Sequence, residues 1–108
     1  MELHEYASLD AVGLAALVRS GQVSAQEVEA TARRAIELVN PDLNALTQPL
    51  FEPALDHDAT GPLAGVPFLI KDSGPFARGV SFTLGSRSIR GAVADVDHEL
   101  MSRGRLEK

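Results

Sequence analysis

The sequence predicts an α/β fold, in which helices at the N-terminus precede the first strands of a mixed sheet. Two observations support this prediction. Apolar residues recur with helical spacing up to about residue 39, and an unbroken apolar run of strand length follows at Val66–Ile70. Proline and glycine separate the two regions. We expect a helical arm over residues 1–42 and the start of an α/β core over residues 43–108.

Two helices are expected in the arm. The first should cover residues 8–20, with Ser8 as its N-cap and Gly21 just past its end, where a positive φ is needed. The second should follow the capping box Ser24-Ala25-Gln26-Glu27 and cover residues 25–39. Pro41 is expected to stop it, because proline disfavours the helical conformation in the preceding residue.

The second region should be less regular. A short strand is expected at Asn44–Thr47 and a helical turn near Phe51–His57. Val66–Ile70 is apolar on both faces, which predicts a central strand, with Pro67 at its entry. Ser73–Gly91 should form a long ordered loop, and Asp95–Leu106 a last helix.

The composition argues against several classes of protein. A net charge of −5 gives no electrostatic reason to bind nucleic acid or an anionic membrane. The chain has no cysteine, which rules out thiolate chemistry and fits a cytoplasmic location. No apolar run approaches a membrane span, and the first residues do not resemble a signal peptide. We therefore expect no nucleic acid, no membrane and no cofactor.

Two candidate sites are rejected on sequence grounds. His57 lies between Asp56 and Asp58, but a solvated acidic turn explains this pattern better than a metal site. Gly61 and Gly65 bracket a loop that precedes a strand, whereas a phosphate-binding loop precedes a helix.

Lys71 is the candidate catalytic residue. It is one of only two lysines, and it ends the run that reads as the most buried strand. A lysine must be neutral to act as a base, and burial lowers its pKa because desolvation penalises the charged form. From position alone, a surface lysine paired with Asp72 is the favoured interpretation, because structural ion pairs are commoner than active sites.

The surrounding residues resemble the amidase signature family. Gly61-Pro62-Leu63-Ala64-Gly65-Val66-Pro67-Phe68-Leu69-Ile70-Lys71-Asp72 is similar to the first conserved block of that family, and Thr83-Leu84-Gly85-Ser86 is similar to its T-x-G-S segment. The similarity covers nearly the whole chain in the correct order. Details such as Pro49-Leu50-Phe51-Glu52 resemble the branch that includes 6-aminohexanoate cyclic dimer hydrolase.

The resemblance implies a Ser-Ser-Lys amidase, in which Lys71 is the base of a proton relay through two serines. Those serines belong to a Gly-Gly-Ser-Ser-Gly-Gly block and a later segment, and neither is present among the 108 residues. Ser86 matches the T-x-G-S segment, where it should line the site rather than attack the substrate. The chain therefore corresponds to an incomplete N-terminal part of an amidase domain, expected to be inactive alone.

Three interpretations follow. The chain is the N-terminal part of an enzyme that hydrolyses a small-molecule amide, or one half of a split amidase completed by a partner chain. The third is a non-catalytic binding domain. An apolar strand without neighbours would also favour self-association.

Overall fold

The computed structural model describes residues 1–104, and most of its regular structure is helical. The helices are α1 (Leu3–Ser8), α2 (Ala11–Arg19), α3 (Ala25–Leu43) and α4 (Glu99–Gly104), with a 3₁₀ helix, η1, at Arg87–Ile89. The chain divides into two compact units. The first comprises residues 1–54 and 59–67, and the second comprises residues 55–58 and 68–108.

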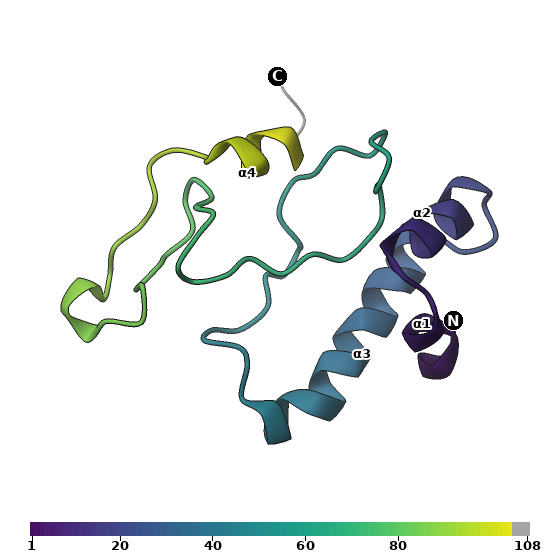
Figure 1. Ribbon diagram of the computed structural model, residues 1–108, viewed down its shortest axis with the longest axis horizontal. Coiled ribbons are helices and arrows are strands. Elements are labelled where there is room, and N and C mark those ends of the chain that lie inside the picture. The colour runs from purple at the N-terminus through teal and green to yellow at the C-terminus, as the bar shows by residue number, and fades with distance from the viewer. Residues whose placement is uncertain (105–108) are drawn as a thin grey trace. The chain divides into compact units, whose positions relative to one another are not determined.

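The first unit is built around α3. In Figure 1, α1 and α2 lie along the N-terminal half of this helix. The side chains that fill the core between them are small or medium in size: Leu14, Ala15, Val28, Thr31 and Ala32. The C-terminal half of α3 lacks this cover, and Leu38 and Leu43 are largely exposed.

The first unit also contains a helix that the sequence analysis missed. Residues 3–8 form α1, so the expected start of a helix at Ser8 is wrong. Ser8 instead lies at the end of α1, where its hydroxyl donates to the Glu5 carbonyl oxygen at 2.8 Å. Asp10 provides the N-cap of α2, because its carboxylate accepts from the Gly13 amide at 2.8 Å.

The end of α2 confirms the role predicted for Gly21. Its φ is +76°, and the amides of Gly21 and Gln22 donate to the carbonyl oxygens of Val18 and Leu17. These two bonds are the pair that defines a Schellman motif.

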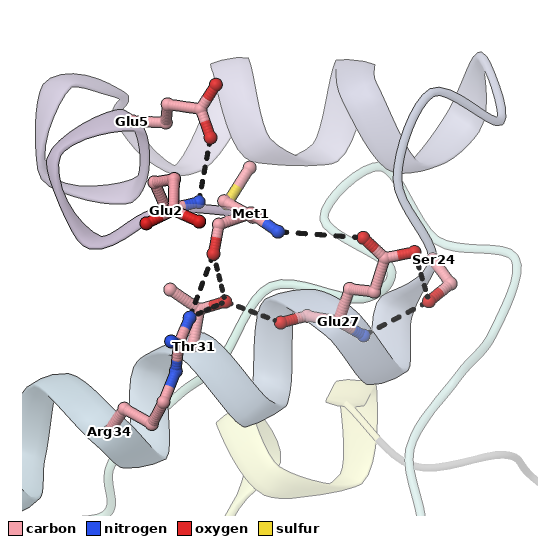
Figure 2. A network of polar contacts seen from close by, with 7 residues as sticks. All are labelled: Met1, Glu2, Glu5, Ser24, Glu27, Thr31 and Arg34. Carbon is pink, nitrogen blue, oxygen red and sulfur yellow. Dashed lines mark hydrogen bonds and ion pairs between the residues drawn. The ribbon is translucent and has the colours of Figure 1, made fainter.

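The start of α3 confirms half of the predicted capping box, since the Ser24 hydroxyl accepts from the Glu27 amide at 3.1 Å. The other half, a bond from the Ser24 amide to the Glu27 carboxylate, is not formed. The Glu27 carboxylate lies 3.7 Å from the amino group of Met1 (Figure 2). Met1 is held further by its carbonyl oxygen, which accepts from the Thr31 hydroxyl at 3.3 Å and from Arg34 at 2.9 Å. This network ties the first residues to α3.

Pro41 does not stop α3, which continues to Leu43. The helix ends at Asn44, whose φ is +49° and whose amide donates to the Asn40 carbonyl oxygen at 2.6 Å. The side-chain oxygen of Asn40 then accepts from the amides of Ala45 and Leu46. Asn40 therefore organises the exit, and a proline in the last turn disturbs few of the helix's own hydrogen bonds.

Neither of the expected strands, at residues 44–47 and 66–70, is present in residues 1–104, nor is the expected helical turn at residues 51–57. A strand needs a partner for its backbone groups, and the described chain offers Val66–Ile70 none. In the second unit, a β-bridge joins Ser81 and Val93. The predicted last helix is α4, but it begins at Glu99 and not at Asp95. Its expected end, at residues 105–106, lies outside the described residues.

The second unit is organised by a short antiparallel contact. Backbone hydrogen bonds join residues 79–82 to residues 92–94, around the buried side chains of Ala77 and Ala94. The rings of Phe76 and Phe82 stack at 4.1 Å beside this contact. Residues 83–91 form the loop between the two paired segments.

Candidate functional site

The block that resembles an amidase begins on the first unit. Gly65 has a φ of +84° and is the third residue of a turn in which the Val66 amide donates to the Leu63 carbonyl oxygen. A Cβ at Gly65 would lie 3.0 Å from the Val18 side chain and 3.2 Å from that of Ala25. Glycine is therefore required here both for the backbone conformation and for close packing on α2 and α3.

Lys71 belongs to the second unit and is exposed. The expected burial at the end of a central strand is not seen, because Phe68 and Leu69 are themselves 65% and 56% exposed. Among residues 1–104, the Lys71 side chain has no hydrogen bond or ion pair. The interpretation of Lys71 as a lysine paired with Asp72 is therefore not supported within the described residues.

Asp72 instead binds the loop that carries the second motif. Its carboxylate accepts from the Thr83 hydroxyl at 2.6 Å, from the Thr83 amide at 2.8 Å and from the Gly85 amide at 3.2 Å. Three donors stabilise the ionised form, so the pKa of Asp72 is lowered, first of all by the Thr83 hydroxyl. We call these contacts the Asp72 clamp.

The clamp holds a turn with an unfavourable backbone. Leu84 and Gly85 have φ values of +52° and +75°, and the Ser86 amide donates to the Thr83 carbonyl oxygen at 2.8 Å. Positive φ at both central residues is the pattern of a type I′ turn. A leucine in the left-handed region costs roughly 1–2 kcal/mol, which the hydrogen bonds donated to the Asp72 carboxylate help to offset.

The end of the turn leads directly into η1. The Ser86 hydroxyl accepts from the Ser88 amide at 3.2 Å and lies 2.7 Å from the Ser88 hydroxyl. Ser86 also lines a hollow of about 170 Å³, together with Thr83, Gly85, Arg87 and Arg90. The role expected of Ser86 in lining an amidase site stays a prediction.

A second polar contact fixes the start of α4 in this unit. The Phe76 amide donates to Nδ1 of His98 at 3.2 Å, and the His98 amide donates to the Phe76 carbonyl oxygen at 2.9 Å. The two rings lie 4.7 Å apart. A ring nitrogen that accepts from an amide carries no proton, so the proton of the neutral imidazole is on Nε2.

His57 and its two aspartate neighbours were considered as a metal site in the sequence. His57 is exposed, and its Nδ1 lies 3.2 Å from the Leu55 carbonyl oxygen. Residues 1–104 contain no group of three or more histidine or carboxylate side chains placed to hold a metal ion. No helix in the same range is long and apolar enough to cross a membrane.

Sequence reasoning identified both motifs but missed their connection. It considered Asp72 only as a neighbour of Lys71, whereas the structure uses it to join residues 71–72 to residues 83–85. The available signal was Leu84-Gly85 after Thr83, a turn whose amides need an acceptor.

Comparison with known proteins supports an amidase-like relationship over part of the chain. Ninety-two residues, 83% of the chain, are 37% identical to proteins named 6-aminohexanoate-cyclic-dimer hydrolase from Pseudomonas sp. (strain NK87) and Paenarthrobacter ureafaciens. Seventy residues, 60% of the chain, are 44% identical to the Mycobacterium tuberculosis protein named Putative amidase AmiC.

These matches cover only a small share of the relatives. The matched stretch is 19% of the length of the two hydrolases and 15% of that of the mycobacterial protein. No family model matches the chain. No solved structure matches it either. The chain is thus similar to part of an amide hydrolase, over a stretch that includes most of its residues.

Proposed function

We propose that this chain is the N-terminal part of a serine amidase, with Lys71 as the general base of a Ser-Ser-Lys mechanism. The observation that carries the proposal is the Asp72 clamp. It joins the segment that ends the first motif to the Thr83–Ser86 turn of the second, at 2.6 Å between Asp72 and the Thr83 hydroxyl. Two segments that resemble neighbouring parts of one active site are therefore neighbours in space.

In this mechanism a serine oxygen attacks the amide carbonyl carbon and forms an acyl-enzyme. A second serine passes the proton of the nucleophile to the Lys71 amine, which later returns a proton to the leaving amine as the carbon–nitrogen bond breaks. Water then attacks the acyl-enzyme and releases the carboxylic acid. None of the serines of this chain matches the position of either relay serine, so the 108 residues alone should hydrolyse no amide.

The exposure of Lys71 supports the view that further protein completes the site. Lys71 is exposed in the described chain, whereas a lysine base acts in surroundings that exclude solvent. Phe68 and Leu69, just before it, expose apolar surface that packing would cover. The same apolar surface would favour self-association. The missing surface and serines would come from the remainder of a longer protein or from a separate complementing chain.

The substrate is proposed to be a small-molecule amide. The printed name of the two hydrolases describes action on the cyclic dimer of 6-aminohexanoate, an amino acid whose cyclic dimer contains amide bonds. That substrate is the first to test for this chain. The absence of cysteine suits a reducing compartment, and we place the enzyme in the cytoplasm.

The test replaces the matching stretch of the Paenarthrobacter hydrolase with this chain and measures hydrolysis of the cyclic dimer. We expect the chimera to be active. In the Lys71→Ala variant the hydrolysis rate should fall at least about a hundredfold, which is the usual contribution of a general base. Lys71→Arg should lose as much, because arginine stays charged. The control, Arg103→Gln, removes an exposed charge and should keep full activity.

An active chimera that tolerates Lys71→Ala would refute the role of Lys71. A folded but inactive chimera would favour the alternative of a non-catalytic binding domain. Hydrolysis by the isolated chain would contradict the proposed need for the missing serines.

A further inference from the structure

The arginines of the described chain differ in whether their guanidinium groups have a hydrogen-bond or ion-pair partner. Arg33 donates to Glu29 at 2.7 Å, and Arg103 pairs with Glu99 at 2.6 Å. In contrast, the Arg87 and Arg90 side chains have no hydrogen bond or ion pair with any of residues 1–104. Two unmatched cations close together in an acidic chain need a physical explanation.

The geometry of η1 brings these two cations to the same side. Arg87 is the first residue of this 3₁₀ helix, and Arg90 follows three positions later as its C-cap. Side chains at positions i and i+3 of a 3₁₀ helix eclipse one another. Accordingly, both arginines line the hollow of about 170 Å³ beside the Thr83–Ser86 turn.

Ser86 adds a neutral donor to the same hollow. Its oxygen accepts from the Ser88 amide and lies 2.7 Å from the Ser88 hydroxyl. A hydroxyl has one proton and two lone pairs, so when Ser88 donates, the Ser86 proton is available to a ligand. The hollow then offers two guanidinium groups and one hydroxyl proton.

The acidic group that reaches this lining does not neutralise the arginines. Asp72 contacts the lining residues Thr83 and Gly85, but its oxygens are occupied by the three donors of the clamp. An anion in the hollow would therefore meet guanidinium groups that no described carboxylate already binds. Paired guanidinium donors match the planar oxygens of a carboxylate particularly well.

We propose that Arg87, Arg90 and Ser86 form a binding site for a carboxylate group. Anion binding follows from the geometry alone, whereas the choice of carboxylate over phosphate rests on the proposed amide hydrolysis, which releases a carboxylate. The site would hold the acid end of a product or of a linear amide substrate, beside the loop that carries Lys71.

The test is an NMR titration of the 108-residue chain with sodium acetate, at constant ionic strength, following the amides of Gly85 and Ser86. Acetamide is the neutral control probe, and inorganic phosphate is the competing anion. We expect saturable, millimolar binding of acetate that acetamide does not reproduce. Arg87→Gln combined with Arg90→Gln should weaken binding by about tenfold or more. Arg87→Lys should weaken it by less, because the charge remains.

The control for Arg87→Gln alone is Arg103→Gln, which removes one positive charge elsewhere in the same unit. An equal effect from this variant would show general electrostatics and overturn the site. Absence of saturation by acetate would overturn it as well, and tight binding of phosphate with none of acetate would overturn the carboxylate assignment. Because no step of this test requires catalysis, its failure would leave the Lys71 experiment unaffected, and the converse is also true.

Discussion

Asp72 and Thr83 lie eleven residues apart in sequence and are joined by two hydrogen bonds, 2.6 Å from the hydroxyl and 2.8 Å from the amide. This pair fixes the backbone next to Lys71 relative to a turn that contains Leu84 at φ +52°. Lys71 therefore follows an apolar, exposed segment but precedes an anchored one. In the proposed complete enzyme, this anchor would hold the backbone next to Lys71 in place.

The first prediction concerns the pH dependence of the clamp. Because the pKa of Asp72 is lowered, the unfolded chain binds more protons than the folded chain at acid pH. The clamp therefore contributes its full stabilisation at pH values above 3.8, the ordinary pKa of an aspartate carboxyl group. This contribution disappears as the pH falls through the lowered pKa of Asp72. NMR of the Asp72 carboxyl carbon should show a midpoint below 3.8.

Thr83→Val should raise that midpoint towards the ordinary value, because the hydroxyl is the largest cause of the lowered pKa. Thr83→Ser keeps a hydroxyl and is the control. Hydrogen exchange of the Gly85 amide should accelerate in the valine variant and not in the serine variant. Equal midpoints in the valine and serine variants would contradict the assigned cause.

The second prediction separates backbone strain from crowding at two glycines. Gly65 and Gly21 have similar φ values, +84° and +76°, but a Cβ at Gly21 would meet nothing within 4 Å. Gly21→Ala should lower the free energy of unfolding by roughly 1 kcal/mol, because alanine is strained in the left-handed conformation. Gly65→Ala should also force Val18 and Ala25 apart, for a total of about 2–4 kcal/mol. Urea unfolding of both variants measures the difference, and equal losses would show that the loop shifts freely.

The third prediction tests the network in Figure 2. Thr31 is buried, and its hydroxyl lies 2.8 Å from the Glu27 carbonyl oxygen and 3.3 Å from that of Met1. Thr31→Val keeps the shape but removes the donor, so we expect a loss of about 1 kcal/mol in the free energy of unfolding. Thr47→Val, at an exposed position, should change it little. A thermal melt that is unchanged by Thr31→Val would show that the hydroxyl bonds contribute nothing.

Features that depend on neighbouring residues in the sequence were predicted, whereas features that depend on residues far apart in the sequence were not. The cap at Ser24 and the glycine at position 21 follow from their own neighbours, and both were predicted correctly. Lys71 was selected from its local pattern, and its exposure agrees with the surface-lysine alternative rather than with the burial expected at the end of a central strand. The strand expected at residues 66–70 requires partners distant in sequence, and the described chain supplies none. The Asp72 clamp was missed for the same reason, since it spans eleven residues.

The fourth prediction concerns His98, which connects the start of α4 to Phe76. Its Nδ1 accepts from the Phe76 amide at 3.2 Å, and its ring lies 4.7 Å from the Phe76 ring. His98→Asn places an oxygen where Nδ1 was and should preserve protection of the Phe76 amide, whereas His98→Ala should lose both contacts, at a cost of about 1–2 kcal/mol. Hydrogen exchange at Phe76 and the ring-current shifts of Phe82, which stacks on Phe76 at 4.1 Å, report the two effects separately. Loss of protection in both variants would show that the ring contact, and not the acceptor at Nδ1, holds α4 in place.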